Sequence, residues 1–415
     1  MTMNNDEFDT RARCPTSHRP KIMWTRRELL KYLGLGAAGV LATEVTSQFL
    51  PGVVSGTTTL PVRTSQDFAL RGTIVTINTL CHNARNYQPH GWNILEDLGV
   101  NVVAVGGGIE GDVAHFNMNS YPDEWAKNLD TFLAQAEAHG VKVAFKQLGN
   151  KYGTLFNIVA PEPGYEVAGT PIESAKKMVD RLAGSNSLAL NFIADPRIFG
   201  WSVANEVDMG DPTTRDWCIQ MLDYIRSKGG KAYVGSPCDS RFPRDSITRD
   251  LTVDFHFLEP TLRGHADYLE CHIYELQTVV DAINKGLDVY EATYNIFRDR
   301  MRSLMIDGRG TFLMNELILG EFGMWHGKAT GSYQVTYDFD EKTRGAYYRA
   351  VYQAASDLGI SNIANECCFD QKYRDGSYAA PPYGIIDTDG TYFIECTSVL
   401  QYYYKIPGSV RSHFE

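Results

Sequence analysis

The chain has few cysteines, no excess of basic residues and no long apolar run. Its 8 cysteines among 415 residues are widely spaced and form no C-x-x-C pair, so neither a small disulfide scaffold nor a structural zinc site is expected. The formal charge of -11 excludes a basic surface that attracts nucleic acid or anionic lipid. With 43% hydrophobic and 21% charged residues, the composition is that of a globular enzyme, and an uncharged partner fits it better.

The N-terminal segment differs from the rest of the chain. Arg26 and Arg27 are followed by two leucines and a lysine, and then by an apolar run over 32–43, which at about 12 residues is too short to span a bilayer. This pattern resembles a twin-arginine export signal, although an amphipathic helix with two chance arginines is the alternative. We expect residues 1–55 to be signal and linker and residues 56–415 to be one domain. The protein is then extracellular, or anchored at the cell surface if the signal is retained.

From residue 70 onward, short β-branched runs alternate with amphipathic helical stretches. This alternation is typical of parallel strands joined by crossover helices. The clearest helix covers 124–139, where apolar residues recur at spacings of three and four and Gly140 ends the pattern. Further helices are predicted at 172–183, 215–227, 289–304, 341–358 and 397–404. Strands are predicted at 72–77, 101–105, 141–145, 198–204, 231–234, 268–273, 317–320 and 362–364.

Eight such units predict a (β/α)8 TIM barrel. In that fold the active site lies where the C-terminal ends of the strands meet. A doubly wound open sheet is the competing architecture, but no G-x-G-x-x-G follows the first strand, and the glycines at 106–108 are only a cluster at a strand end. The barrel is therefore the expected fold.

Two glutamates follow strands that lie far apart in the sequence. Glu206 comes after the fourth predicted strand and Glu321 ends the seventh. A retaining glycosidase needs two carboxyl groups about 5 Å apart, one to protonate the leaving oxygen and one to attack the anomeric carbon. In a closed barrel the ends of strands four and seven lie across the same mouth. Glu206, arriving protonated, and Glu321, ionised, are therefore the predicted catalytic pair.

With these residues the mature domain, from about Leu70 to Tyr404, resembles the clan A glycoside hydrolases. Within that clan it is most similar to family 5, the cellulase and mannanase family. The resemblance rests on three motifs in the expected order. They are Asn205-Glu206 after strand four, His272-Ile273-Tyr274 after strand six, and Glu321 within Leu-Gly-Glu-Phe-Gly at strand seven.

The resemblance implies a role for each matched residue. Glu206 is the acid/base and Glu321 the nucleophile, while Asn205 is placed to bond the sugar 2-hydroxyl. Tyr274 is expected to donate a hydrogen bond to the nucleophile. His272 is expected to orient the acid or the substrate, with a packing histidine as the alternative.

The chain departs from the family at two strands. Strand two reads Val-Gly-Gly-Gly where the family commonly has an arginine that supports the nucleophile, and no replacement is evident. Strand eight ends in Asn365 and Glu366 where a tryptophan usually lies under the sugar. Both are candidate substrate-binding residues, with a structural role as the alternative for Glu366. The missing arginine favours a divergent branch of the family or another clan A family. If Glu321 is not the nucleophile, Glu366 is the nearest replacement.

Four further residues are candidates for binding the substrate. Glu110 and Gln147 lie after strands on the expected face and are candidates for bonding sugar hydroxyls, with solvated loop positions as the alternative. Trp325 and His326 follow the nucleophile, where an aromatic ring packs well against a pyranose face. The alternative for Trp325 is packing within its own loop.

The sequence thus predicts a retaining glycoside hydrolase that acts on a β-linked polysaccharide or oligosaccharide, β-1,4 glucan or mannan. This mechanism requires no metal or organic cofactor. The alternatives are a carbohydrate-binding barrel without catalysis, and an exo-glycosidase or transglycosylase of the same clan. Sequence alone does not determine the sugar, the choice between endo and exo action, or the oligomeric state.

Overall fold

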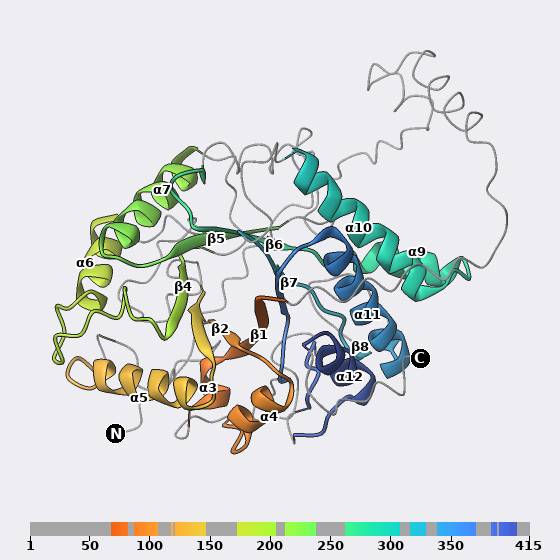
Figure 1. The fold of residues 1–415 in the computed structure, drawn as a ribbon, viewed down its shortest axis with the longest axis horizontal. Helices are drawn as coiled ribbons and strands as arrows, with labels where there is room; N and C mark the ends of the chain where they lie inside the picture. The colour runs from red at the N-terminus through yellow and green to blue at the C-terminus, as the bar shows by residue number, and fades with distance from the viewer. Residues whose placement is uncertain are drawn as a thin grey trace, which may run out of the picture. The chain divides into compact units, whose positions relative to one another are not determined.

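Eight parallel strands close into a barrel in the computed structural model of the chain (Figure 1). The structure describes residues 68–81, 87–106, 118, 121–146, 172–204, 212–237, 262–307, 316–328, 338–370, 383–387 and 390–404. The barrel strands are β1 (Leu70–Thr76), β2 (Val102–Gly106), β3 (Lys142–Phe145), β4 (Ile198–Ser202), β5 (Ala232–Pro237), β6 (Tyr268–His272), β7 (Leu317–Glu321) and β10 (Asn362–Asn365).

Each barrel strand pairs in parallel with both of its neighbours. The order around the barrel is β1-β10-β7-β6-β5-β4-β3-β2, so β1 pairs with both β2 and β10 and closes the ring. This confirms the predicted (β/α)8 barrel. The predicted signal segment, 1–55, lies outside the described residues.

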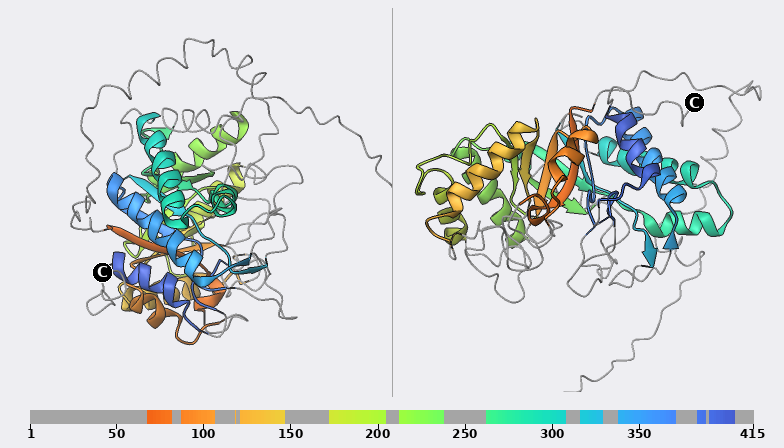
Figure 2. Two further views of the ribbon diagram at one scale, coloured as in Figure 1. Left: turned by 90° about the vertical axis from the view of Figure 1, so that its right-hand side faces the viewer. Right: turned by 90° about the horizontal axis from the view of Figure 1, so that it is seen from below.

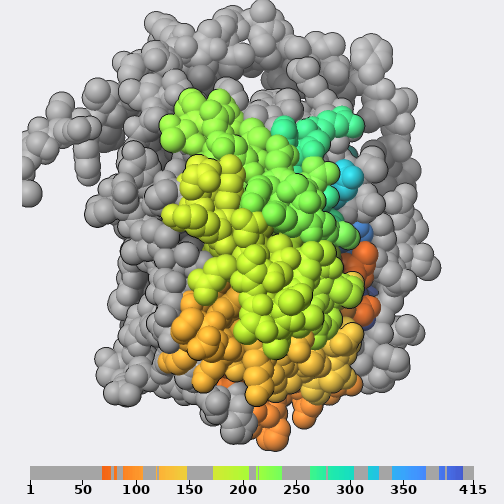
Figure 3. Space-filling view, turned by 90° about the vertical axis from the view of Figure 1, so that its left-hand side faces the viewer, coloured from red at the N-terminus to blue at the C-terminus, as the bar shows by residue number. Residues whose placement is uncertain are grey.

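Helices surround the barrel as the alternating pattern predicts. They are α3 (Ile77–Leu80), α4 (Gly91–Asp97), α5 (Trp125–Ala138), α6 (Ile172–Leu182), α7 (Pro212–Ser227), α9 (Leu276–Asn284), α10 (Val289–Asp307), α11 (Glu341–Leu358) and α12 (Ile394–Tyr403). Figure 2 shows α10 and α11 packed side by side. In Figure 3, α5, α6 and α7 follow one another across one face. The short helices α3, α4 and α9 are not among the predicted ones.

Local sequence explains where α11 begins and ends. The Asp340 side chain accepts a hydrogen bond from the backbone N–H of Thr343, which caps the first turn. Gly359 ends the helix at a φ of 79°, a left-handed conformation that glycine adopts without strain. The observed bounds match the predicted 341–358.

The barrel interior is apolar along the first half of its strands. A cluster of small and aliphatic side chains fills it, drawn from the inward-facing positions of five strands: Leu70, Val102, Ala104, Ala144, Ile318 and Ala364. A much larger apolar cluster lies between the strands and the helices.

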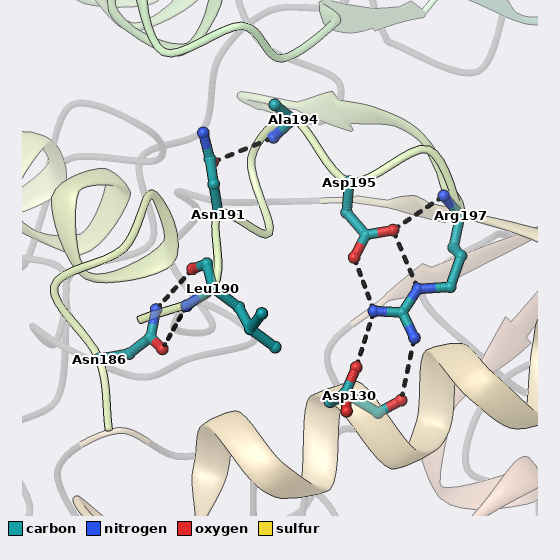
Figure 4. A network of polar contacts seen from close by, with 7 residues as sticks. All are labelled: Asp130, Asn186, Leu190, Asn191, Ala194, Asp195 and Arg197. Atoms are coloured by element: carbon teal, nitrogen blue, oxygen red, sulfur yellow. Dashed lines mark hydrogen bonds and ion pairs between the residues drawn. The ribbon is translucent and has the colours of Figure 1, made fainter. Parts of the chain in front are cut away.

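A charged network lies where β4 begins. The Arg197 guanidinium binds Asp195 through two nitrogens and reaches Asp130 on α5, with Nη2 2.7 Å from a carboxylate oxygen of each (Figure 4). Nearby, the Asn186 side chain accepts from the backbone N–H groups of Leu188 and Leu190. These contacts fix the turn that leads into β4.

Two smaller features complete the described part of the chain. Strands β8 (Gly327–Lys328) and β9 (Asp338–Phe339) form a short antiparallel pair. Ile386 and Tyr392 also pair antiparallel, on either side of residues 388–389, which are outside the described part of the chain. The cysteines among the described residues are all free thiols.

The described residues offer neither a membrane-spanning helix nor a cluster of metal ligands. None of their helices has both the length and the apolar character that a bilayer span needs. Nor do they contain a group of three or more His, Cys, Asp or Glu side chains able to hold a metal ion.

Candidate active site

Glu321 is the last residue of β7, and its carboxylate lies at the C-terminal end of the barrel. All five residues of β7 are buried, and Glu321 itself is 7% exposed. It lies opposite His272 of β6 in the strand register, and its carbonyl accepts the N–H of Ile273 at 2.8 Å. The backbone on both sides of this carboxylate is therefore held by the sheet.

Among the described residues, three side chains contact the Glu321 carboxylate. The Lys146 ammonium donates to Oε1 at 2.6 Å, and the Tyr274 hydroxyl donates to Oε2 at 3.2 Å. His272 Nδ1 lies 3.3 Å from the same Oε2. Each carboxylate oxygen therefore has at least one of these donors beside it. His272 and Tyr274 are the two residues of the strand-six motif.

Lys146 is a site residue that the sequence analysis missed. It follows β3 directly, its side chain is 2% exposed, and its own N–H donates to the carbonyl of Val105 at 2.9 Å. In the barrel order β4, β5 and β6 separate β3 from β7, so the lysine side chain crosses the interior to reach Glu321. It places a positive charge beside Glu321, which strand two of this chain does not provide. The only feature of the sequence that could have indicated Lys146 is its position directly after an apolar strand.

Glu270 is a second residue that the motif search passed over. It lies on β6 two positions before His272, so both side chains face the barrel interior. The residue is 3% exposed, and its Oε1 lies 3.0 Å from the Lys146 ammonium and 3.7 Å from His272 Nε2. Lys146 therefore lies between two carboxylates, Glu270 and Glu321.

The charges of this cluster support one another. Burial by itself lowers the pKa of Lys146, but the carboxylates of Glu270 and Glu321 outweigh burial and raise it above the ordinary lysine value. Burial likewise raises the pKa of Glu270, but Lys146 and His272 more than reverse this and lower it to about 2. The ammonium and the Glu270 carboxylate are therefore both charged at neutral pH.

An aromatic layer supports Tyr274 from behind. The Tyr274 and Tyr383 ring centroids lie 5.5 Å apart, and those of Tyr383 and Trp325 lie 5.8 Å apart with an edge-on geometry. Trp325 in turn packs against Phe339 at 5.6 Å, and its side chain is 1% exposed. In this structure Trp325 is therefore buried between Phe339 of its own loop and Tyr383 of the segment after β10.

His326 belongs to a separate polar pair. Its Nε2 lies 2.5 Å from Asp370 Oδ2, while Asp370 Oδ1 accepts the N–H of Gly384 at 2.7 Å. The His326 ring packs on Phe393, with centroids 4.6 Å apart, and its side chain is 18% exposed. The imidazole is therefore partly exposed beside Asp370 and Phe393.

The two strand-eight candidates differ in exposure. Asn365 is buried, and its amide donates to the carbonyl of Cys367 at 3.3 Å. Glu366 is half-buried, and its N–H donates to the carbonyl of Phe322 at 2.9 Å, which ties β10 to the residue after Glu321. The Glu321 contacts given above are to Lys146, Tyr274 and His272, and do not involve Asn365 or Glu366.

Four of the predicted site residues lie outside the described part of the chain. Their roles therefore remain predictions. After β4 the structure describes the chain up to Ala204, the residue before Asn205. Ala204 is buried, and its carbonyl accepts the N–H of Gly235 at 3.1 Å. The residues outside are Asn205, Glu206, Glu110 and Gln147.

Comparison with known proteins gives likenesses in structure only. No protein-family model matches the sequence, and neither does any curated protein. A β-glucuronidase from Faecalibacterium prausnitzii matches with a TM-score of 0.50 and 12% identity over 83% of this chain and 50% of its own. A β-D-glucuronidase from Dictyoglomus thermophilum matches with a TM-score of 0.50 and 11% identity over 83% and 51%.

A smaller protein is also similar. An active-site mutant of the Rhizomucor miehei β-1,3-glucanosyltransferase, solved with laminaritriose, matches with a TM-score of 0.46 and 12% identity over 78% of this chain and 95% of its own. The chain spans about half the length of both glucuronidases. At these identities the likeness shows the barrel fold alone, so any argument about activity rests on the site itself.

Proposed function

We propose that the protein is a retaining glycosidase that hydrolyses a β-linked glucan or mannan. Glu321 is the nucleophile and Glu206 the acid/base. One observation carries the proposal: a buried carboxylate at the C-terminal end of a barrel strand is contacted by Lys146, Tyr274 and His272. The active sites of TIM-barrel enzymes lie on this face of the fold.

The environment of Glu321 suits a nucleophile better than an acid. An acid must keep its proton until the substrate arrives, and it therefore lies in surroundings that disfavour charge. Glu321 instead lies beside an ammonium, with donors to both oxygens, which is the setting of a carboxylate that attacks. This leaves the proton-donating role to a second carboxyl group, for which Glu206 is the candidate.

The reaction then takes two steps. In the first, a Glu321 oxygen bonds to the anomeric carbon while the glycosidic bond breaks, and the leaving oxygen takes the proton of Glu206. In the second, Glu206 removes a proton from water, the water oxygen bonds to the anomeric carbon, and the ester bond breaks to return the Glu321 carboxylate. Asn205 bonds the sugar 2-hydroxyl in both steps.

Three kinds of aryl glycoside serve as substrates to test the proposal. Aryl β-glucosides and β-mannosides test the proposed sugars. An aryl β-glucuronide is added because two proteins of similar fold are described as β-glucuronidases. Release of the aryl group measures both steps of the proposed reaction, and the linkage of the natural glycan need not be known.

Three amide variants test the assignment. Glu321→Gln and Glu206→Gln should each lower kcat/KM by about 10³-fold or more, since each removes a group that acts on the reacting bonds. Glu366→Gln is the matched control at the neighbouring strand end and should retain activity within about tenfold. A 2-deoxy-2-fluoro glycoside should label Glu321, which peptide mass spectrometry identifies.

Two results would contradict the proposal. Label on Glu366, together with an active Glu321→Gln variant, would move the nucleophile to strand eight. A protein that binds a glycan but turns over none of the three aryl glycosides would be a carbohydrate-binding barrel without catalysis.

A further inference from the structure

The buried carboxylate of Glu270 has no part in the two-step reaction described above. Among the described residues it reaches the nucleophile through Lys146 and His272, each of which lies close to both carboxylates. Its Oε1 shares the ammonium with Glu321, at 3.0 Å against 2.6 Å for Glu321. Burial by itself makes a carboxylate that is 3% exposed costly to keep charged, so the charge of Glu270 depends on its partners.

The barrel makes room for this side chain by means of two glycines. A Cβ atom on Gly320 of β7 would overlap the side chain of Glu270. A Cβ on Gly235 of β5 would come within 2.9 Å of Glu270 Oε2 and of His272 Nε2. The strands on both sides of β6 therefore lack side chains at the level of Glu270, and the carboxylate packs against their backbones.

The two carboxylates carry different charges at different stages of the proposed reaction. Before attack, Lys146 lies between two anions, so its positive charge is divided between them. Once Glu321 has become a glycosyl ester, its negative charge is gone. Lys146 is then paired with Glu270 alone and does not remain as an unpaired ammonium in a buried site.

We propose that Glu270 is a positioning residue that shares Lys146 with the nucleophile and keeps this lysine paired while Glu321 carries the sugar. The inference rests on the proposed function, since it takes Glu321 to be the nucleophile. Without Glu270, Lys146 binds Glu321 alone and stabilises its carboxylate more strongly. That stabilisation opposes the first step, in which the carboxylate charge is lost, and favours the second, in which the charge returns.

The Glu270→Gln variant separates these two effects. The amide keeps the shape of the side chain and removes its charge. We expect the rate of glycosyl-ester formation to fall about tenfold and the rate of ester hydrolysis to stay equal or rise, so that their ratio falls about tenfold or more. A purely structural defect lowers the amount of folded protein and leaves this ratio unchanged.

The measurement uses a 2-deoxy-2-fluoro aryl glycoside of whichever sugar the protein turns over. Loss of activity with time gives the rate of ester formation, and its return after removal of the reagent gives the rate of ester hydrolysis. Asp195→Asn is the matched control, because it replaces one of two carboxylates around a cation at the other end of the barrel. Both of its rates should equal those of the unmutated protein.

A second variant protects the test. Glu270→Asp keeps the carboxylate on a shorter side chain and should restore the ratio toward that of the unmutated protein. If the ratio is the same in Glu270→Gln and in the unmutated protein, the inference is wrong while the proposed function stands. If the unmutated protein is neither active nor labelled, the proposed function fails and this inference fails with it.

Discussion

Arg197 and Lys146 each lie between two carboxylates, but at opposite ends of the barrel strands. Arg197 precedes β4 and binds Asp195 and Asp130, with side chains that are 16%, 12% and 41% exposed (Figure 4). Lys146 follows β3 and binds Glu270 and Glu321, with side chains that are 2%, 3% and 9% exposed. The same arrangement of charges is thus partly hydrated at one end and dry at the other.

The difference in hydration changes what the charges do. Water can replace a lost partner in the Arg197 network, so that network mainly orders the turn before β4. In the Lys146 cluster the side chains are too buried for water to replace a lost partner. The charges of Lys146, Glu270 and Glu321 therefore depend on one another. This dependence makes the cluster sensitive to any change of charge, including the one that a reacting carboxylate undergoes.

Removing the cation should show the largest contrast. Lys146→Met leaves two buried carboxylates without their ammonium and should lower the free energy of unfolding by about 3 to 5 kcal/mol, with loss of activity. Arg197→Met should cost about 1 kcal/mol, since its carboxylates are partly hydrated, and should leave activity intact. Denaturant unfolding and aryl glycoside turnover measure both. Equal losses of stability in the two variants would contradict the comparison.

Acid should weaken the dry cluster through Glu270. Its pKa falls from about 4.5 when unfolded to about 2 when folded, so its contribution is fully present above about pH 4.5 and is lost as the pH falls toward 2. This contribution is on the order of 3 kcal/mol. Glu270→Gln should therefore show a smaller drop in the free energy of unfolding between pH 6 and pH 3 than the unmutated protein.

The control for the acid experiment is Asp195→Asn, measured by the same denaturant unfolding at both values of pH. It shows how far any replacement of a carboxylate by an amide flattens the pH dependence. If both variants reduce the pH dependence of the free energy of unfolding equally, the effect is not specific to Glu270.

Hydroxyl deletion should give the smallest effect. Tyr274→Phe removes the donor to Glu321 Oε2 and should lower kcat/KM about tenfold, because the carboxylate keeps Lys146. Tyr224→Phe removes a donor to Asp180 on the outer helices and should leave kcat/KM unchanged, with a loss of stability below about 1 kcal/mol. Matched losses of activity in the two variants would show that Tyr274 acts only in packing.

Local patterns predicted most of the fold. The apolar periodicity and the terminal Gly140 placed α5 within one residue of its observed ends, and α11 agrees at both ends. Helix α9 was missed although its apolar residues recur with helical spacing, because it is short and directly follows the strand-six motif. The barrel itself followed from the number and alternation of strands, which is a property of the whole chain rather than of any one motif.

The site was only partly predictable. Glu321, His272 and Tyr274 carry recognisable motifs at strand ends, and the structure brings them together. Lys146 and Glu270 carry no motif, since a lysine after a strand and a glutamate within one have many local explanations. Trp325 was open between two roles, and in the structure it is buried between Tyr383 and Phe339.

The sequence by itself determined the alternation of strands and helices and the carboxylate that ends β7, because both depend on residues close together in the chain. Only the tertiary structure decided what holds that carboxylate. Lys146 and Glu321 are 175 residues apart, and they meet because closure of the barrel brings the ends of β3, β6 and β7 around one interior. A buried charge is stable only beside its partner, and chain closure alone determines which residues become partners.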